Sequence, residues 1–67
     1  MSDHQDLEGE VRFFLFVKHE HSAERDEIVQ YLVNRLRISK AAARKVVKKM
    51  LQDKKLQQKE GIFSLPD

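Results

Sequence analysis

Apolar residues recur at helical spacing in the first third of the chain. At 100° per residue, the residues that share one face are Leu7, Val11, Phe14 and Leu15. Acidic residues fill the first turns, where the positive end of a helix dipole favours them. We therefore expect a helix over about residues 6–19, preceded by a flexible N-terminus over residues 1–5.

Two further apolar stripes have the same period. The first belongs to a helix that ends near Leu36 and that Ser22 is placed to cap. Its members, four residues apart, are Ile28, Leu32 and Leu36. The second belongs to a helix over about residues 40–54, with Ser39 as its N-cap. Its members are Ala43, Val46, Val47, Met50 and Leu51.

Near the C-terminus, the apolar residues no longer follow the helical spacing. Residues 56–58 and 62–65 flank a tight connection that ends in Gly61, a residue able to adopt a positive φ. Pro66 follows the second segment, where no ladder donor is required. The chain is thus predicted to be one small α+β domain over residues 6–67, with three helices and a C-terminal two-stranded β-hairpin. A three-helix bundle with an unstructured tail is the alternative.

Length and composition limit the range of possible functions. A chain of 67 residues has little room for an enclosed pocket, and the lack of cysteine excludes disulfides, cysteine-bound zinc and a cysteine nucleophile. The apolar run at residues 13–17 is too short for a membrane span, and no targeting segment is recognisable. We expect an intracellular protein, cytoplasmic or nuclear, that is not an enzyme and has no cofactor, no membrane partner and no small-molecule substrate.

His19 and His21, with Glu20 between them, suggest a metal at first sight. Two ligands on one face of a helix require a spacing of four residues, whereas these histidines are two apart. We interpret them as surface residues and expect no metal site.

The net charge of +2 conceals an uneven distribution. Residues 1–24 carry −4, residues 25–36 balance to zero, residues 37–55 carry +7 and the last twelve residues carry −1. The positive charge falls on the polar side of the third predicted helix. A concentration of this kind indicates a polyanionic partner, and a merely solvated face is the plainer interpretation.

Three segments in and between the second and third predicted helices form a recognisable pattern. They read Glu27-Ile28-Val29-Gln30-Tyr31-Leu32, then Leu36-Arg37-Ile38-Ser39-Lys40, then Val46-Val47-Lys48-Lys49-Met50-Leu51. Together with the hairpin they resemble the winged helix-turn-helix superfamily of DNA-binding proteins, over about residues 8–65. Arg37 departs from the glycine that is usual there, and Lys59 is the only basic residue of a short wing. The branch that binds Z-form DNA relies on a wing tryptophan. This chain has no tryptophan, so the sequence does not favour that branch.

The resemblance implies a small transcriptional regulator or repressor that binds double-stranded DNA sequence-specifically, with helix 40–54 in the major groove. Arg44 is the candidate for contacting guanine, because its guanidinium group can donate hydrogen bonds to O6 and N7 at the same time. Lys45, Lys48 and Lys49 are candidates for phosphates. The other candidate contacts are Ser39, Lys40, Ala41 and Lys59.

Phe13 and Phe16 widen the apolar arc of the first helix beyond what one core face needs. Extra core is one interpretation, and a homodimer interface that lets two copies read two half-sites is the other. The same residues support an alternative function, a winged-helix protein–protein interaction module that binds a partner through its aromatic first helix.

Overall fold

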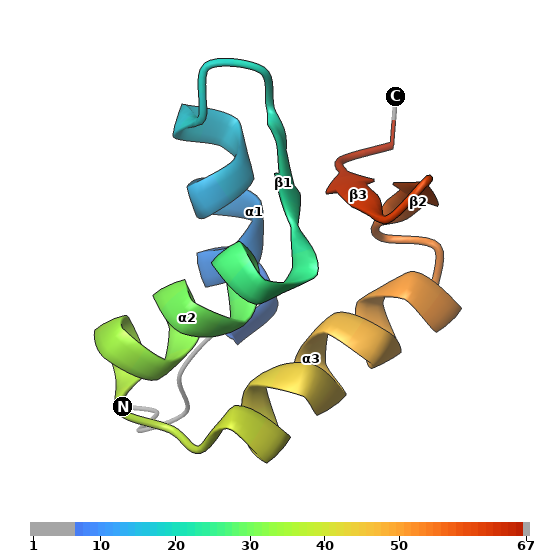
Figure 1. The fold of residues 1–67 in the computed structure, drawn as a ribbon. Coiled ribbons are helices and arrows are strands. Elements are labelled where there is room, and N and C mark those ends of the chain that lie inside the picture. Colours follow the sequence, from blue (N-terminus) through green and yellow to red (C-terminus); the bar gives the residue numbers. More distant parts are fainter. Residues whose placement is uncertain (1–6, 67) are drawn as a thin grey trace.

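The computed structural model describes residues 7–66, so the expected flexible segment at residues 1–5, and also Asp6 and Asp67, lie outside the described residues. The elements are α1 (Leu7–Val17), β1 (Ser22–Glu24), α2 (Arg25–Leu36), α3 (Lys40–Gln52), β2 (Gln57–Lys59) and β3 (Ile62–Ser64) (Figure 1). Three helices and one antiparallel sheet confirm the predicted α+β class. Within residues 7–66, no helix has the length and apolar content needed to cross a membrane.

The helices follow the apolar stripes but are shorter than predicted. α1 ends at Val17 rather than near residue 19, and α3 ends at Gln52 rather than near residue 54. The end of α3 has a local cause: Lys54 adopts a left-handed conformation with φ 63°. The N–H of Lys55 then donates to the carbonyl of Met50 at 2.8 Å, which satisfies one of the last helical carbonyls.

The sheet contains a strand that the sequence analysis missed. β3 lies in the centre, with β1 on one side and β2 on the other, and both pairs are antiparallel. Ala23 of β1 lies opposite Phe63 of β3, and both side chains are buried. The predicted hairpin is confirmed, as two strands of a three-stranded sheet, and the bundle with an unstructured tail is excluded.

The start of α2 differs from the prediction. Ser22 is not its cap, because this residue pairs with Ser64 in the sheet. The N-cap is Glu24, whose backbone N–H donates to Oε1 of Glu27 at 3.1 Å. That hydrogen bond, together with the Lys18 ammonium 3.3 Å from the other carboxylate oxygen, holds the pKa of Glu27 below its usual value.

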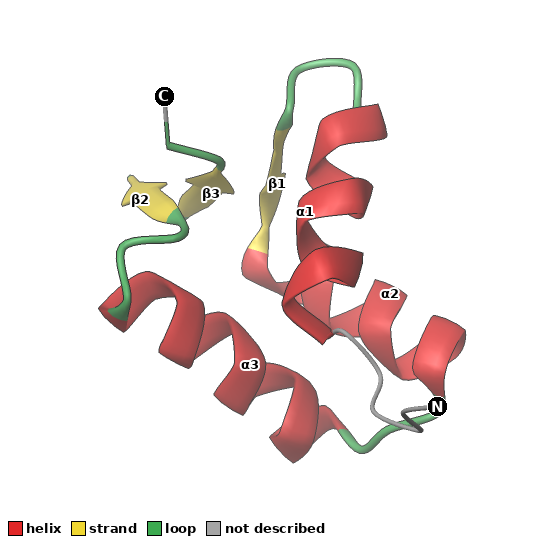
Figure 2. Cartoon of the chain, turned by 180° about the vertical axis from the view of Figure 1, so that it is seen from behind, coloured by secondary structure: helices red, strands yellow, loops and turns green. Residues whose placement is uncertain are grey.

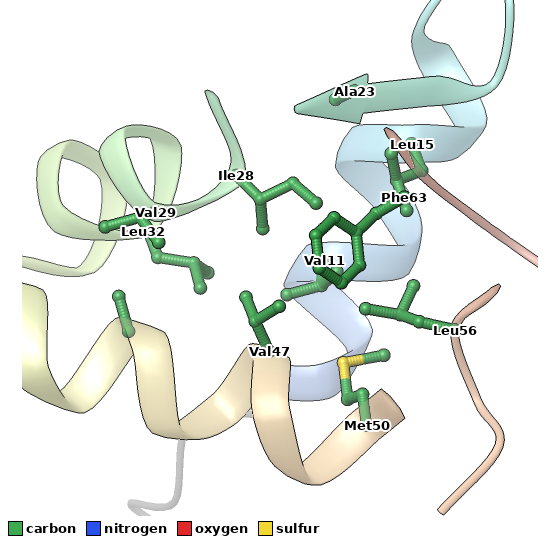
Figure 3. Packing of buried hydrophobic residues seen from close by; sticks show 11 residues of the cluster. Val11, Leu15, Ala23, Ile28, Val29, Leu32, Val47, Met50, Leu56 and Phe63 are labelled. Atoms are coloured by element: carbon green, nitrogen blue, oxygen red, sulfur yellow. The ribbon is translucent and has the colours of Figure 1, made fainter. Parts of the chain in front are cut away.

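Apolar side chains from all the elements except β2 meet in one core. Figure 3 shows the ring of Phe63 pointing from β3 into the space between the helices. The buried residues are Val11, Leu15, Ala23, Ile28, Val29, Leu32, Ala43, Val47, Met50, Leu56 and Phe63. Seen from behind, α1 lies beside β1, and α2 and α3 diverge from the short turn that joins them (Figure 2). At the edge of the core, Phe14 stacks on Tyr31 with 4.5 Å between ring centroids.

Positive φ values also occur in the connection between α2 and α3 and in the hairpin turn. Arg37 ends α2 at φ 57° and ψ 37°, and its N–H donates to the carbonyl of Val33 at 2.9 Å. Ser39 then caps α3 as predicted, because its Oγ accepts the N–H of Ala42 at 3.1 Å. In the hairpin, Glu60 at φ 54° and Gly61 at φ 82° form the turn, and two positive φ values are typical of a type I′ turn.

Replacing Arg37 with glycine is expected to stabilise the domain by about 1 kcal/mol, because a left-handed conformation strains a residue with a Cβ atom and does not strain glycine. Urea unfolding of Arg37→Gly measures the change. Lys45→Gly is the control, since glycine inside an exposed helix costs about 1 kcal/mol. A loss of stability in Arg37→Gly would contradict the strained turn.

The lowered pKa of Glu27 makes part of the stability dependent on pH. A carboxylate whose pKa is lower in the folded state stabilises above its unfolded pKa, and this contribution disappears as the pH falls through the folded pKa. We expect Glu27→Gln to be less stable than the wild type at pH 7, and the difference should shrink as the pH falls through the lowered pKa of Glu27. Urea unfolding over a series of pH values from neutral to acid tests this, and a difference that does not change with pH would refute it.

Candidate nucleic-acid interface

α3 has one buried and one exposed side. Ala43, Val47 and Met50 face the core, with exposed fractions of 0%, 2% and 0%. The exposed residues are Lys40, Ala41, Arg44, Lys45, Lys48, Lys49 and Gln52, as the helical period predicts. No acidic residue occurs in α3, so its exposed side carries charge of one sign.

The dimensions of α3 suit a groove of duplex DNA. Its 13 residues extend about 20 Å at ~1.5 Å per residue. Arg44 and Lys48 lie one turn apart, about 6 Å along the axis, and therefore point in similar directions. A major groove about 12 Å wide admits one helix of this kind.

The first turn of α3 differs from those of the other helices. α1 and α2 have acidic residues in their first turns, whereas α3 has none and begins with Lys40. An acid at this end would stabilise the helix through its dipole, and it would also repel a phosphate. The Oγ of Ser39 accepts the Ala42 N–H, so the Ser39 side chain acts as a cap and its hydroxyl proton is still able to reach an acceptor.

Ion pairs divide the cations into two groups. Lys49 pairs with Asp53 at 3.3 Å, and Lys55 pairs with Glu8 at 2.7 Å, a contact that raises the pKa of Lys55. Both residues contributed to the charge of +7 counted from the sequence, and both are partly neutralised. Within residues 7–66, the other cations of α3 make no ion pair, and they are Lys40, Arg44, Lys45 and Lys48.

The fold adds Arg25 to this surface, a residue that the sequence analysis did not select. Arg25 is the first residue of α2, and it lines a shallow hollow together with Arg44 and Lys48 of α3. Gln58 of β2 forms another wall. The apolar part of the lining consists of Val47, Leu51 and Phe63. Three cations from two helices thus border one depression, next to the hairpin.

Lys59 is not part of this group. It lies opposite Ile62 in the sheet, and neighbouring residues of a strand point to opposite faces, so Lys59 and Gln58 lie on different faces. Gln58 is on the side that borders Arg44, and the nearby turn carries Glu60. A second hollow shares Arg25, Gln58 and Phe63 with the first and is also lined by Glu24, Asp26 and Glu60. Acids therefore lie close to Arg25 on the side of the hairpin turn.

The remaining candidates lie elsewhere. Phe13 and Phe16 are exposed on α1, with exposed fractions of 59% and 67%, so neither ring belongs to the core. The ring of His21 lies 6.0 Å from that of Phe16. Within the described residues, no group of three side chains is arranged to hold a metal ion.

Searches of protein-family models, of curated proteins and of solved structures found no match to this chain.

Proposed function

We propose that this protein is a sequence-specific double-stranded DNA-binding protein of winged helix-turn-helix architecture, a small transcriptional regulator or repressor. The observation that carries the proposal is the exposed side of α3, which has no acidic residue and has four cations without an ion pair within residues 7–66. Surface cations on soluble proteins are usually interspersed with acids, whereas a one-sided field attracts a polyanion.

The arrangement of elements supports the winged-helix part of the proposal. α2 and α3 are joined by a tight turn, Arg37 to Ser39, and the hairpin follows α3 directly. This order is the pattern that the sequence resembles. The hairpin, which would be the wing, has one cation, Lys59, with the acid Glu60 beside it, so α3 rather than the wing supplies most of the contacts.

The residues divide into two kinds of contact. Arg44 is exposed near the middle of α3 and reads guanine through its bidentate fork. Lys45, Lys48 and Arg25 meet phosphates, which position the helix without specifying sequence. Lys49 joins them when its exposed pair with Asp53 opens, at little cost, because exposed ion pairs contribute about 0–1 kcal/mol.

A salt titration of duplex binding tests the proposal. Neutralising four or five phosphates predicts that log K falls against log[salt] with a slope of about −4. Random duplex should bind with micromolar affinity or better at low salt. No binding under these conditions, or a slope near zero, would overturn the proposal and favour the protein-interaction module.

The double variant Arg44→Gln with Lys48→Gln tests the assignment to α3. We expect the duplex affinity to fall at least about tenfold, because the variant loses one base contact and one phosphate contact. Gln30→Glu with Asn34→Asp is the matched control. It changes the net charge by the same amount on the exposed side of α2, where the Gln30 amide donates to Oδ1 of Asn34. Equal losses in both double variants would show that net charge, rather than α3, determines the affinity.

Arg25→Gln tests the residue that only the fold revealed. Loss of one phosphate contact should weaken all duplex sequences alike and reduce the steepness of the salt dependence by about 1. Fluorescence anisotropy with two unrelated duplexes measures both quantities. An unchanged slope would remove Arg25 from the interface and leave the assignment of α3 intact.

A further inference from the structure

The hollow between α2, α3 and the hairpin combines positive charge with an apolar floor. Its volume is about 230 Å³, and Arg25, Arg44 and Lys48 are exposed at its rim, together with the amide of Gln58. The floor consists of Val47, Leu51 and Phe63. Among residues 7–66, no acidic side chain lines this hollow. A phosphate of a DNA backbone can use the cations, but it has no apolar group to cover the floor.

The three cations at the rim are available to a ligand. Within the described part of the chain, none of them makes an ion pair. Val47 and Phe63, which lie beneath them, are only 2% and 4% exposed, so the core holds the backbone that carries α3 and β3 at this point. Like charges gathered around one depression repel one another, and an anion bound among them relieves this repulsion.

A phosphomonoester matches this set of groups better than the phosphodiester of a DNA backbone does. Each backbone phosphate carries a single negative charge, whereas a phosphomonoester carries about −1.5 to −2 at pH 7 and has three strong acceptor oxygens. Each oxygen can accept a charge-assisted hydrogen bond from one of the cations. We propose that the hollow binds the phosphomonoester of a nucleotide, with the phosphate among Arg25, Arg44 and Lys48 and the attached ring over Leu51.

The floor and the size of the hollow favour a nucleotide over other phosphomonoesters. Leu51 is half-buried, and the face of a sugar or a base covers it, whereas a phosphoserine side chain offers only a methylene group. Sites for drug-sized ligands have volumes of about 300–1,000 Å³, so this smaller hollow takes the phosphate and one ring and leaves the remainder in solvent. A free mononucleotide and the 5′-phosphorylated end of a strand both have this chemistry.

Acidic neighbours limit where the phosphate can lie. The adjoining hollow shares Arg25 with this one and has three acids in its lining. They are Glu24, Asp26 and Glu60. These carboxylates repel a dianion from the side of the hairpin turn. The phosphate therefore lies on the side of α3, close to Arg44 and Lys48.

Nucleotide binding in the hollow would regulate DNA binding, and this consequence rests on the proposed function. The proposed function assigns Arg44 to a base and Lys48 to a phosphate of the duplex. A nucleotide in the hollow engages the same two side chains, so nucleotide and duplex compete, and each lowers the apparent affinity of the other. Binding of the nucleotide itself does not rest on the proposed function, because it depends only on the groups that line the hollow.

Calorimetric titration of the full chain with adenosine 5′-monophosphate tests the ligand, at a pH above the second phosphate pKa of about 6. Adenosine and inorganic phosphate are the matched comparisons, because each lacks one part of the nucleotide. We expect the nucleotide to bind at least about tenfold more tightly than inorganic phosphate, since only the nucleotide uses both the cations and the floor, and we expect no saturable binding of adenosine.

One short single strand, with and without a 5′-phosphate, distinguishes the two sources of the ligand. Tighter binding of the phosphorylated strand assigns the hollow to strand ends, and equal binding of the two strands assigns it to the free nucleotide. The proposal is overturned if the nucleotide binds no better than inorganic phosphate and the 5′-phosphate adds nothing to the binding of the strand.

Gln58→Glu tests the place of binding, because it adds a carboxylate to the wall of the hollow at an exposed position of β2. We expect the affinity for the nucleotide to fall at least about tenfold, since like charges then face each other. Gln57→Glu is the matched control. It makes the same charge change at the neighbouring exposed residue, on the opposite face of β2, and should leave the affinity within about twofold in ~0.1 M salt. No loss in Gln58→Glu, or equal losses in both variants, would overturn the hollow as the site.

Displacement of a bound duplex by the nucleotide, followed by fluorescence anisotropy at constant ionic strength, tests the regulation. The anisotropy of a labelled duplex should fall as the nucleotide saturates the hollow. A duplex that stays bound at saturating nucleotide would contradict the competition. A chain that binds the nucleotide but no duplex would contradict the proposed function and leave the nucleotide site intact.

Discussion

A single core shared by almost the whole chain is the constraint on which this structure depends. A domain of this size buries only about 60% of the surface that its unfolded chain exposes, so each apolar stripe is needed inside. α1, α2 and α3 each turn one stripe inward, and Phe63 fills the space between them from the sheet. The core therefore determines which side of every helix remains for solvent and for partners.

The consequence is clearest in α3. Its apolar side packs in the core, so its cations lie on the opposite, exposed side. No acidic residue of α3 lies among them. The position of α2 then brings Arg25 beside Arg44 and Lys48. The packing of α2 and α3 in the core thus determines which side chains form the proposed DNA-binding surface. The same holds for α1. Its buried side packs in the core, and its exposed side carries phenylalanines where α3 carries cations.

Features that depend on local spacing were predictable. Helical periods located the three helices and both sides of α3, and Ser39 and Gly61 marked a cap and a turn. β1 was not predictable, because it has three residues, only one of them apolar, and its partner strand lies about forty residues further along the chain. The place of Arg25 and the pairing of Lys55 with Glu8 likewise depend on contacts between distant segments. Lys59 was assigned by its position in the hairpin, and its face followed only from the strand register.

An NMR titration of the uniformly ¹⁵N-labelled chain with duplex DNA tests whether α3 is the binding surface, because it locates the contact residue by residue. If α3 binds the duplex, the largest amide shift changes fall on the exposed side of α3, from Lys40 to Gln52, and extend to Arg25 and Gln58 across the hollow. Shift changes centred on the outer side of α1, or none at saturating duplex in low salt, would contradict it.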